Sequence, residues 1–207
     1  MKRIALLVLL LVAVLAAHSQ VASAQDATAE VDLATPAPAD CTVAPRSVDE
    51  IEALVGSGDN ATVEVALETP NANAATPTPF DAPAGTPVAE GDTATAITDI
   101  VTQFYACRNA NDTLRLFALM TDDFVVRTID SGAIDPAAFA NIGTPSTEVV
   151  ASEHVTIAVN GIIEVEPDIY GVNVVGVAGD SGEEFTDYLI VIRDGDRYLI
   201  DDVLNLS

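Results

Sequence analysis

Residue types that could carry acid–base or metal chemistry are scarce in this sequence. His154 is the only histidine after residue 24, and it stands where an alternating apolar stretch begins. A histidine there could act as an acid or a base, although a surface position or a structural hydrogen bond is the commoner role. One histidine beside a cysteine pair that is expected to be oxidised predicts no zinc site of the His/Cys type.

Paired aspartates are the second candidate for chemistry. Asp122–Asp123 and Asp201–Asp202 offer the carboxylate oxygens that calcium prefers. Neighbouring side chains on a strand point to opposite faces, so solvated charge or helix capping is the favoured interpretation. The chain has no glycine-rich phosphate loop, no nucleophile elbow and no Ser/His/Asp order. We therefore predict no metal and no cofactor.

The two cysteines, Cys41 and Cys107, are the third candidate. In an oxidising compartment an isolated pair commonly forms a disulfide. Two buried thiols or a bridge between chains are the alternatives. An intramolecular bond would be worth ~4 kcal/mol on the chain-entropy model, because it closes a long loop.

The first 24 residues indicate export. Lys2 and Arg3 precede an uninterrupted apolar run from Ile4 to Ala17, and Ala22–Ser23–Ala24 supplies the small residues of a cleavage site. The run is shorter than the ~20 apolar residues of a spanning helix. We expect cleavage near Ala24, a secreted or extracytoplasmic product, and no membrane span after signal removal.

Charge limits the partners. The chain has 32 acidic residues and a formal net charge of −24, which becomes more negative when Lys2 and Arg3 leave. Such a charge repels phosphate backbones and anionic membranes, so nucleic acid is excluded as a partner. An acidic surface serves solubility, and adaptation to high salt gives a similar composition.

Three segments precede the main domain. Residues 25–40 have the Ala/Thr/Pro/Asp composition of a disordered acidic segment. Residues 41–56 hold a short helix, because Ser47 and Glu50 form a capping box before apolar positions at helical spacing. Residues 57–92 are a linker rich in Pro, Ala and Thr, with a weak alternation over residues 62–67.

The remaining residues, 93–207, predict one α+β domain. Apolar spacing indicates a helix ending near Asn109, a second from Thr113 to Met120, and a short third one that Asp135–Pro136 opens. Phe124 to Ile129 is interpreted as a strand. Strands are then predicted over 155–165, 170–178, 185–193 and 198–206. The Asn160–Gly161 pair indicates either a hairpin turn or a bulge in one continuous strand.

The order of these elements resembles a known superfamily. Residues 106–112 (ACRNAND), 119–124 (LMTDDF) and 193–201 (RDGDRYLID) are similar to the first helix end, the following strand start and the last hairpin of nuclear transport factor 2-like, or SnoaL-like, domains. The N-terminal arrangement also resembles secreted bacterial members of unknown function. The resemblance implies a cone-shaped, curved antiparallel sheet packed on N-terminal helices, with a pocket inside the cone.

The resemblance does not imply one activity, since such domains host isomerases, cyclases, dehydratases and binding modules. Ketosteroid isomerases use a tyrosine and an aspartate where this chain has Phe104 and Thr128, so their mechanism does not carry over. We expect a secreted, non-catalytic module that binds a small apolar ligand or mediates assembly. The alternatives are an isomerase, dehydratase or cyclase that uses His154, and a structural homodimer.

Pocket-lining residues are predicted from the aromatic inventory and the lone histidine. Pockets of this kind are apolar with few polar groups. The residues we expect there are Phe104, Phe124, His154 and Tyr188. Alternation places Tyr188, Ile190 and Ile192 on one face of their strand, without showing which face is concave. The short N-terminal helix is expected on the domain exterior, held near the end of the first helix by Cys41–Cys107.

Overall fold

The computed structural model describes residues 32–57, 82–132, 147, 149–179 and 181–206. They belong to one compact unit, Asp32–Ser207. The predicted signal peptide, the alternation at 62–67, most of the predicted linker and the helix predicted to begin at Asp135–Pro136 lie outside the described residues. In the part of the chain that is described, no helix combines the length and the apolar character needed to cross a membrane.

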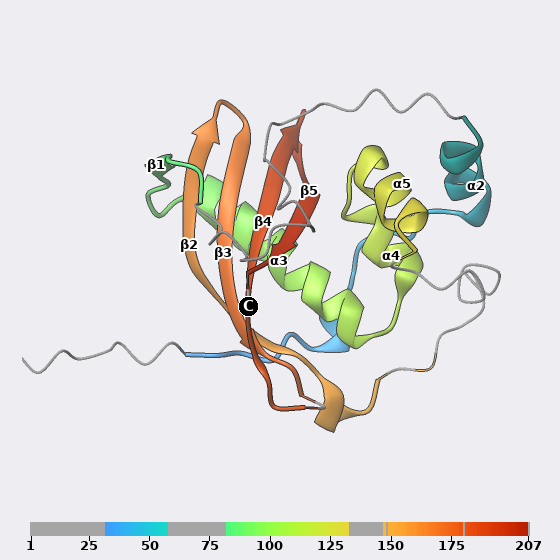
Figure 1. Ribbon diagram of the computed structural model, residues 1–207, viewed down its shortest axis with the longest axis horizontal. Helices are drawn as coiled ribbons and strands as arrows, with labels where there is room; N and C mark the ends of the chain where they lie inside the picture. The colour runs from blue at the N-terminus through green and yellow to red at the C-terminus, as the bar shows by residue number, and fades with distance from the viewer. Residues whose placement is uncertain (1–31, 58–81, 133–146, 148, 180, 207) are drawn as a thin grey trace, which may run out of the picture. The chain divides into compact units, whose positions relative to one another are not determined.

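Along the chain, the short elements η1, α2 and β1 come first, the helices α3 to α5 follow, and the four long strands of the sheet come last (Figure 1). In chain order they are η1 (Pro38–Asp40), α2 (Val48–Ser57), β1 (Thr86–Pro87), α3 (Asp92–Asn109), α4 (Thr113–Ala118), α5 (Asp122–Asp130), η2 (Ala151–Glu153), β2 (Thr156–Glu166), β3 (Ile169–Val177), β4 (Glu184–Asp194) and β5 (Arg197–Asn205).

The sheet is open, fully antiparallel and ordered β1-β2-β3-β4-β5. This confirms the α+β class and the meander of four long strands. β2 runs through Asn160–Gly161 without turning back, and its register against β3 shifts between Val159 and Gly161. Of the two interpretations, the bulged continuous strand is therefore correct.

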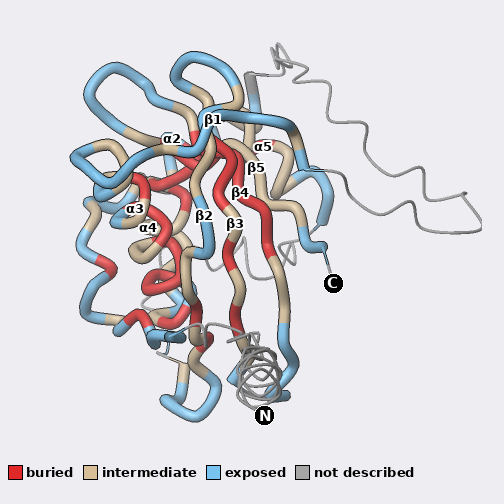
Figure 2. The backbone as a smooth tube through the Cα atoms, turned by 90° about the vertical axis from the view of Figure 1, so that its left-hand side faces the viewer, coloured by how far each residue is buried: buried red, intermediate tan, exposed pale blue. Residues whose placement is uncertain are grey.

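The main core lies between α3 and one face of the sheet. The predicted apolar stripe of α3 is buried, with Ile97, Val101 and Tyr105 fully inaccessible to solvent. Tyr105 stacks on Phe185 of β4 at 6.2 Å between ring centroids. Alternation from Phe185 therefore turns Leu189 and Val191 toward α3. Figure 2 shows the buried positions concentrated along α3, β3 and β4.

The strand predicted from Phe124 to Ile129 is wrong, because these residues belong to helix α5. The β-branched residues Val125 and Val126 suggested a strand, but the local capping signals favour a helix. The Thr121 hydroxyl accepts a hydrogen bond from the Phe124 amide at 3.1 Å, and Asp122 lies in the first turn. Capping and an acidic first turn stabilise a helix start, and here they outweigh strand propensity.

An N-terminal arm, residues 32–57, is part of this unit. Cys41 and Cys107 form the predicted intramolecular disulfide, with 2.03 Å between the sulfurs. η1 packs on α3, as expected for a tether at this helix, but α2 packs on α5. Ile51 of α2 is fully buried, so α2 contributes to the core as well as to the exterior.

Both edges of the sheet are partly covered by segments distant in sequence. Ala34 exchanges two 2.8 Å backbone hydrogen bonds with Ile157 of β2, and β1 pairs with the other end of that strand. At the opposite edge, Leu119 and Thr121 bond the amide and carbonyl of Ile200 in β5. Such coverage reduces the unpaired backbone that an edge strand presents to other chains.

Candidate functional site: a cleft between α2, α5 and the strand ends

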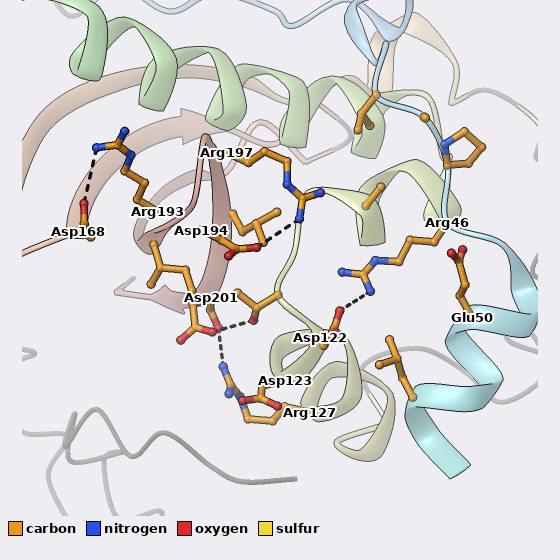
Figure 3. A pocket seen from close by; sticks show the side chains of 18 of the residues that line it. Arg46, Glu50, Asp122, Asp123, Arg127, Asp168, Arg193, Asp194, Arg197 and Asp201 are labelled. Carbon is orange, nitrogen blue, oxygen red and sulfur yellow. Dashed lines mark hydrogen bonds and ion pairs between the residues drawn. The ribbon is translucent and has the colours of Figure 1, made fainter. Parts of the chain in front are cut away.

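The cleft has a volume of about 1010 Å³ and is walled by four separate parts of the chain. One wall is the arm, with residues 43–46 and α2. The second is the end of α4 with the start of α5. The third and fourth are the β2–β3 turn with the start of β3, and the β4–β5 hairpin. Figure 3 shows the strand ends on one side and α2 on the other, with α5 between them.

Apolar side chains form part of this surface. Ile169, Ile192 and Leu199 are register partners on β3, β4 and β5, so they form one row across the sheet. Val43 and Leu54 from the arm and Ala118 from α4 also line the cleft. The row lies on the sheet face opposite α3, because Val191 and Ile200 alternate with it and belong to the main core.

Charged side chains fill the rest of the lining. Four of the six arginines that follow residue 24 are here, together with six carboxylates. The arginines are Arg46, Arg127, Arg193 and Arg197, and the carboxylates are Glu50, Asp122, Asp123, Asp168, Asp194 and Asp201. The cleft is therefore amphipathic, and it holds most of the cationic side chains that follow residue 24.

Arg46 fixes the arm to the helical wall. Its Nε donates to the carbonyl of Phe117 at 2.9 Å, and its Nη2 donates to the carbonyl of Met120 at 2.6 Å. Its Nη1 forms an ion pair with Asp122 at 2.5 Å. These contacts join the arm to the last turn of α4 and to the residues that follow it. The Arg46 side chain therefore has a structural role, which is to hold the arm against α4 and α5.

Arg193 and Arg197 lie at the rim, in ion pairs that face solvent. Arg193 is 3.8 Å from Asp168, and Arg197 is 3.3 Å from Asp194. Asp168 has a positive φ of 65°, a conformation that aspartate tolerates better than most residues. Exposed ion pairs of this kind contribute little to stability, so these side chains can exchange partners at small cost.

Arg127 differs from the other three. One guanidinium nitrogen donates to the main-chain carbonyl of Asp201, and the cation lies 5.6 Å from the centre of the Phe124 ring. The Asp201 carboxylate accepts instead from the Thr121 hydroxyl at 2.7 Å. Among the residues that the structure describes, no carboxylate lies within ion-pair distance of Arg127.

Two carboxyl groups near the cleft have displaced pKa values. Hydrogen bonds from the backbone and then the hydroxyl of Ser47 lower the pKa of Glu50, which confirms the capping box on α2. Burial raises the pKa of Asp202, against the opposing effects of the Val203 amide and of the Arg127 charge. Asp202 therefore holds its negative charge less readily than an exposed aspartate.

The four predicted pocket residues lie apart, and none of them lines this cleft. Phe104 is in the core, edge-on to Tyr105, while Phe124 lies under Arg127. His154 is half-buried, and its Nε2 lies 2.9 Å from the carbonyl of Val149. Tyr188 is 3% exposed on the sheet face opposite α3.

A polar cluster inside the core was not predicted from the sequence. The Tyr105 hydroxyl donates to Asp187 at 2.7 Å, and the side-chain amide of Asn205 donates to the same carboxylate at 3.2 Å. Burial, followed by the charge of Asp187, raises the pKa of Tyr105. The sequence did hold one indication of this cluster: Asp187 stands between Phe185 and Leu189 at the alternating positions of β4 that are otherwise apolar. Both acceptor oxygens have donors, as a buried carboxylate requires.

The cleft offers polar and apolar groups suited to recognition. In the described residues, no group of three metal-ligating side chains lies close enough to hold an ion. Charged groups of the lining pair with one another, with main-chain groups or with hydroxyls. The two hydroxyl–carboxylate contacts, Thr121 with Asp201 and Ser47 with Glu50, involve hydroxyls that cap α5 and α2.

Comparison of the chain with protein-family models, with curated proteins and with solved structures finds no match in any of the three.

Proposed function

We propose that this protein is an exported, non-catalytic module that binds a small amphipathic molecule in the cleft. The observation that carries the proposal is the lining itself, in which an apolar row across three strands lies beside arginine side chains. Ligand sites are concave and largely apolar, with a few polar groups that fix orientation. The disulfide is compatible with an extracytoplasmic location, where such bonds form and persist.

Membership of the nuclear transport factor 2-like superfamily remains part of the proposal. Its support is the order α3, α4 and α5 before the antiparallel meander of β2 to β5, with α3 packed on one sheet face. The binding site proposed here differs from the pocket that the resemblance implied. The space between α3 and the sheet is filled by Tyr105, Leu189, Val191 and their neighbours.

The enzymatic alternative receives no support from the position of His154. A catalytic role requires a carboxylate or a substrate group within hydrogen-bond reach. The contact observed for this side chain is the carbonyl of Val149, and His154 is not part of the cleft. We therefore do not retain the enzymatic alternative.

The test uses a substitution that fills the cleft. Ala53 is exposed on α2 and lines the cleft, whereas its neighbour Glu52 is exposed and does not. Decyl compounds with neutral, anionic and cationic head groups serve as probes, below their micelle-forming concentrations. We expect at least one of them to raise the melting temperature of the wild type and of Glu52→Trp.

We expect Ala53→Trp to lose that shift while keeping the unliganded melting temperature, because the indole occupies the cleft without entering the core. Native mass spectrometry of the purified protein then reports the stoichiometry. If no probe binds, or if both tryptophan variants respond alike, the cleft is not the binding site.

A further inference from the structure

The feature of the cleft that most needs an explanation is the charge pairing of Arg127. In a chain with a formal net charge of −24, a half-buried guanidinium with no carboxylate partner among the described residues is unexpected. Arg46, Arg115, Arg193 and Arg197 each have one. Arg108 lacks a described ion pair too, but its side chain is exposed and lies outside the cleft.

The surroundings hold the Arg127 guanidinium in one orientation. The Asp201 carbonyl accepts from one nitrogen, and the Phe124 ring lies against the cation. The guanidinium has a planar fork of donors suited to a carboxylate or a related anion, and part of that fork is not used by the described contacts. Because its position is already fixed, little side-chain entropy remains to be lost when an anion binds.

The apolar row begins beside this group. Leu199 lies two residues before Asp201 on β5, and its register partner Ile192 continues the row toward Ile169. A molecule with a charged end at Arg127 can therefore lay an apolar body along Leu199, Ile192 and Ile169.

Nearby carboxylates limit the charge of that ligand. Asp123 and Asp201 line the same part of the cleft, and Asp202 is close enough to feel the Arg127 charge. Their repulsion grows with each negative charge on the ligand, so it opposes a dianion about twice as strongly as a monoanion.

We infer that Arg127 binds the head group of the ligand, and that the ligand is a singly charged anion with an apolar body, such as an alkyl or aryl carboxylate or sulfonate. This inference rests on the proposed function of the cleft and adds the chemical class of its ligand. We do not propose inorganic phosphate as the ligand, because it is multiply charged and has no apolar body.

The test compares head groups on one apolar chain. Calorimetric titration with decanoate, decanesulfonate, decyl glucoside and decyltrimethylammonium is expected to show the two anions binding at least about tenfold more tightly than the others, the scale of one charge-assisted contact. Phosphate is expected to give no signal. Equal or tighter binding of the cationic probe overturns the inference, while leaving the cleft itself as a binding site.

Variants then assign the head-group contact. Arg127→Gln is expected to remove the preference for anions, and its amide can still donate to the Asp201 carbonyl. Arg108→Gln makes the same change in net charge outside the cleft and is expected to bind as the wild type does. Unchanged anion affinity in Arg127→Gln contradicts the inference. If that variant folds poorly, Arg127→Lys, which keeps the charge and loses the fork, is expected to show an intermediate preference.

Discussion

At the residue scale, Asp202 is a carboxyl group whose ionisation the fold opposes. Burial is the main cause of its raised pKa, and the neighbouring Asp201 charge acts in the same direction. A group whose pKa is higher in the folded than in the unfolded state stabilises the fold only while it is protonated. That contribution is present below the unfolded pKa and is lost as pH rises through the folded pKa.

The substitution Asp202→Asn is therefore expected to raise the urea midpoint of unfolding at neutral pH. The amide oxygen can still accept from the Val203 amide, which bonds the Asp202 side chain at 2.8 Å. The advantage over the wild type should shrink as pH falls through the folded pKa of Asp202. Asp196→Asn, in the exposed β4–β5 turn, is the matched charge change and should alter the midpoint little at any pH. A lower midpoint for Asp202→Asn at neutral pH would contradict this account.

The candidate site could be predicted only in part from single residues. The cysteine pair was predictable, because the chain has only two cysteines and each therefore has one possible partner within it. The arginines of the cleft were not, since Arg46, Arg127 and Arg193 lie in segments far apart in the sequence. Aromatic residues were expected at a pocket, but Phe104 packs into the core, where its apolar area is buried.

At the element scale, α5 depends on the capping by Thr121. The hydroxyl accepts from the Phe124 amide and donates to Asp201, so one side chain starts the helix and joins it to β5. Thr121→Val keeps the shape and removes both contacts. We expect it to lower the free energy of unfolding by about 1–2 kcal/mol, the scale of a lost N-cap.

Chemical denaturation of Thr121→Val measures that loss, and Thr128→Val is its control. The Thr128 hydroxyl donates to the Phe124 carbonyl within the same helix at 2.7 Å, a contact that adds little to helix stability. The two variants should therefore differ clearly, and equal losses would show that the cap is not what stabilises α5.

The same helix shows where prediction of elements from sequence succeeds. β2 to β5 were predicted to within about two residues, because apolar alternation and turn residues such as Pro, Asp and Gly mark the strand ends. α5 was misassigned because its β-branched residues favour strands while its capping and tertiary contacts favour a helix. Segments with conflicting local signals are decided by packing, which a sequence alone does not display.

At the scale of the whole molecule, the disulfide is one of several contacts that join the arm to the helices and the sheet. Ala34 pairs with β2, the buried side chain of Asn109 donates to the Pro36 carbonyl at 2.9 Å, and Arg46 bonds the end of α4. The arm therefore has more than one attachment, and the bond itself acts chiefly by restricting the unfolded chain.

Cys41→Ser is expected to lower the free energy of unfolding by up to about 4 kcal/mol without releasing the arm. Urea denaturation measures the loss, and the double variant Cys41→Ser/Cys107→Ser should match it. Hydrogen exchange of the Ile157 amide, which bonds Ala34, should stay slow in native conditions. Fast exchange at that amide would show that the disulfide alone keeps the arm in place, and an unchanged midpoint would show that it contributes nothing.

The bond between Cys41 and Cys107 also turns part of the polypeptide into a closed covalent ring, from which the two chain ends leave as tails. A closed ring stays in one covalent piece after a single cut in its backbone. A protease that nicked the backbone once anywhere between these two cysteines would leave both pieces in a single molecule. The arm would keep its bonds to β2, α3 and α4 as well. Only a reductant added after the nick would remove the last covalent link between the pieces, so the backbone and the disulfide are two parallel covalent connections between them.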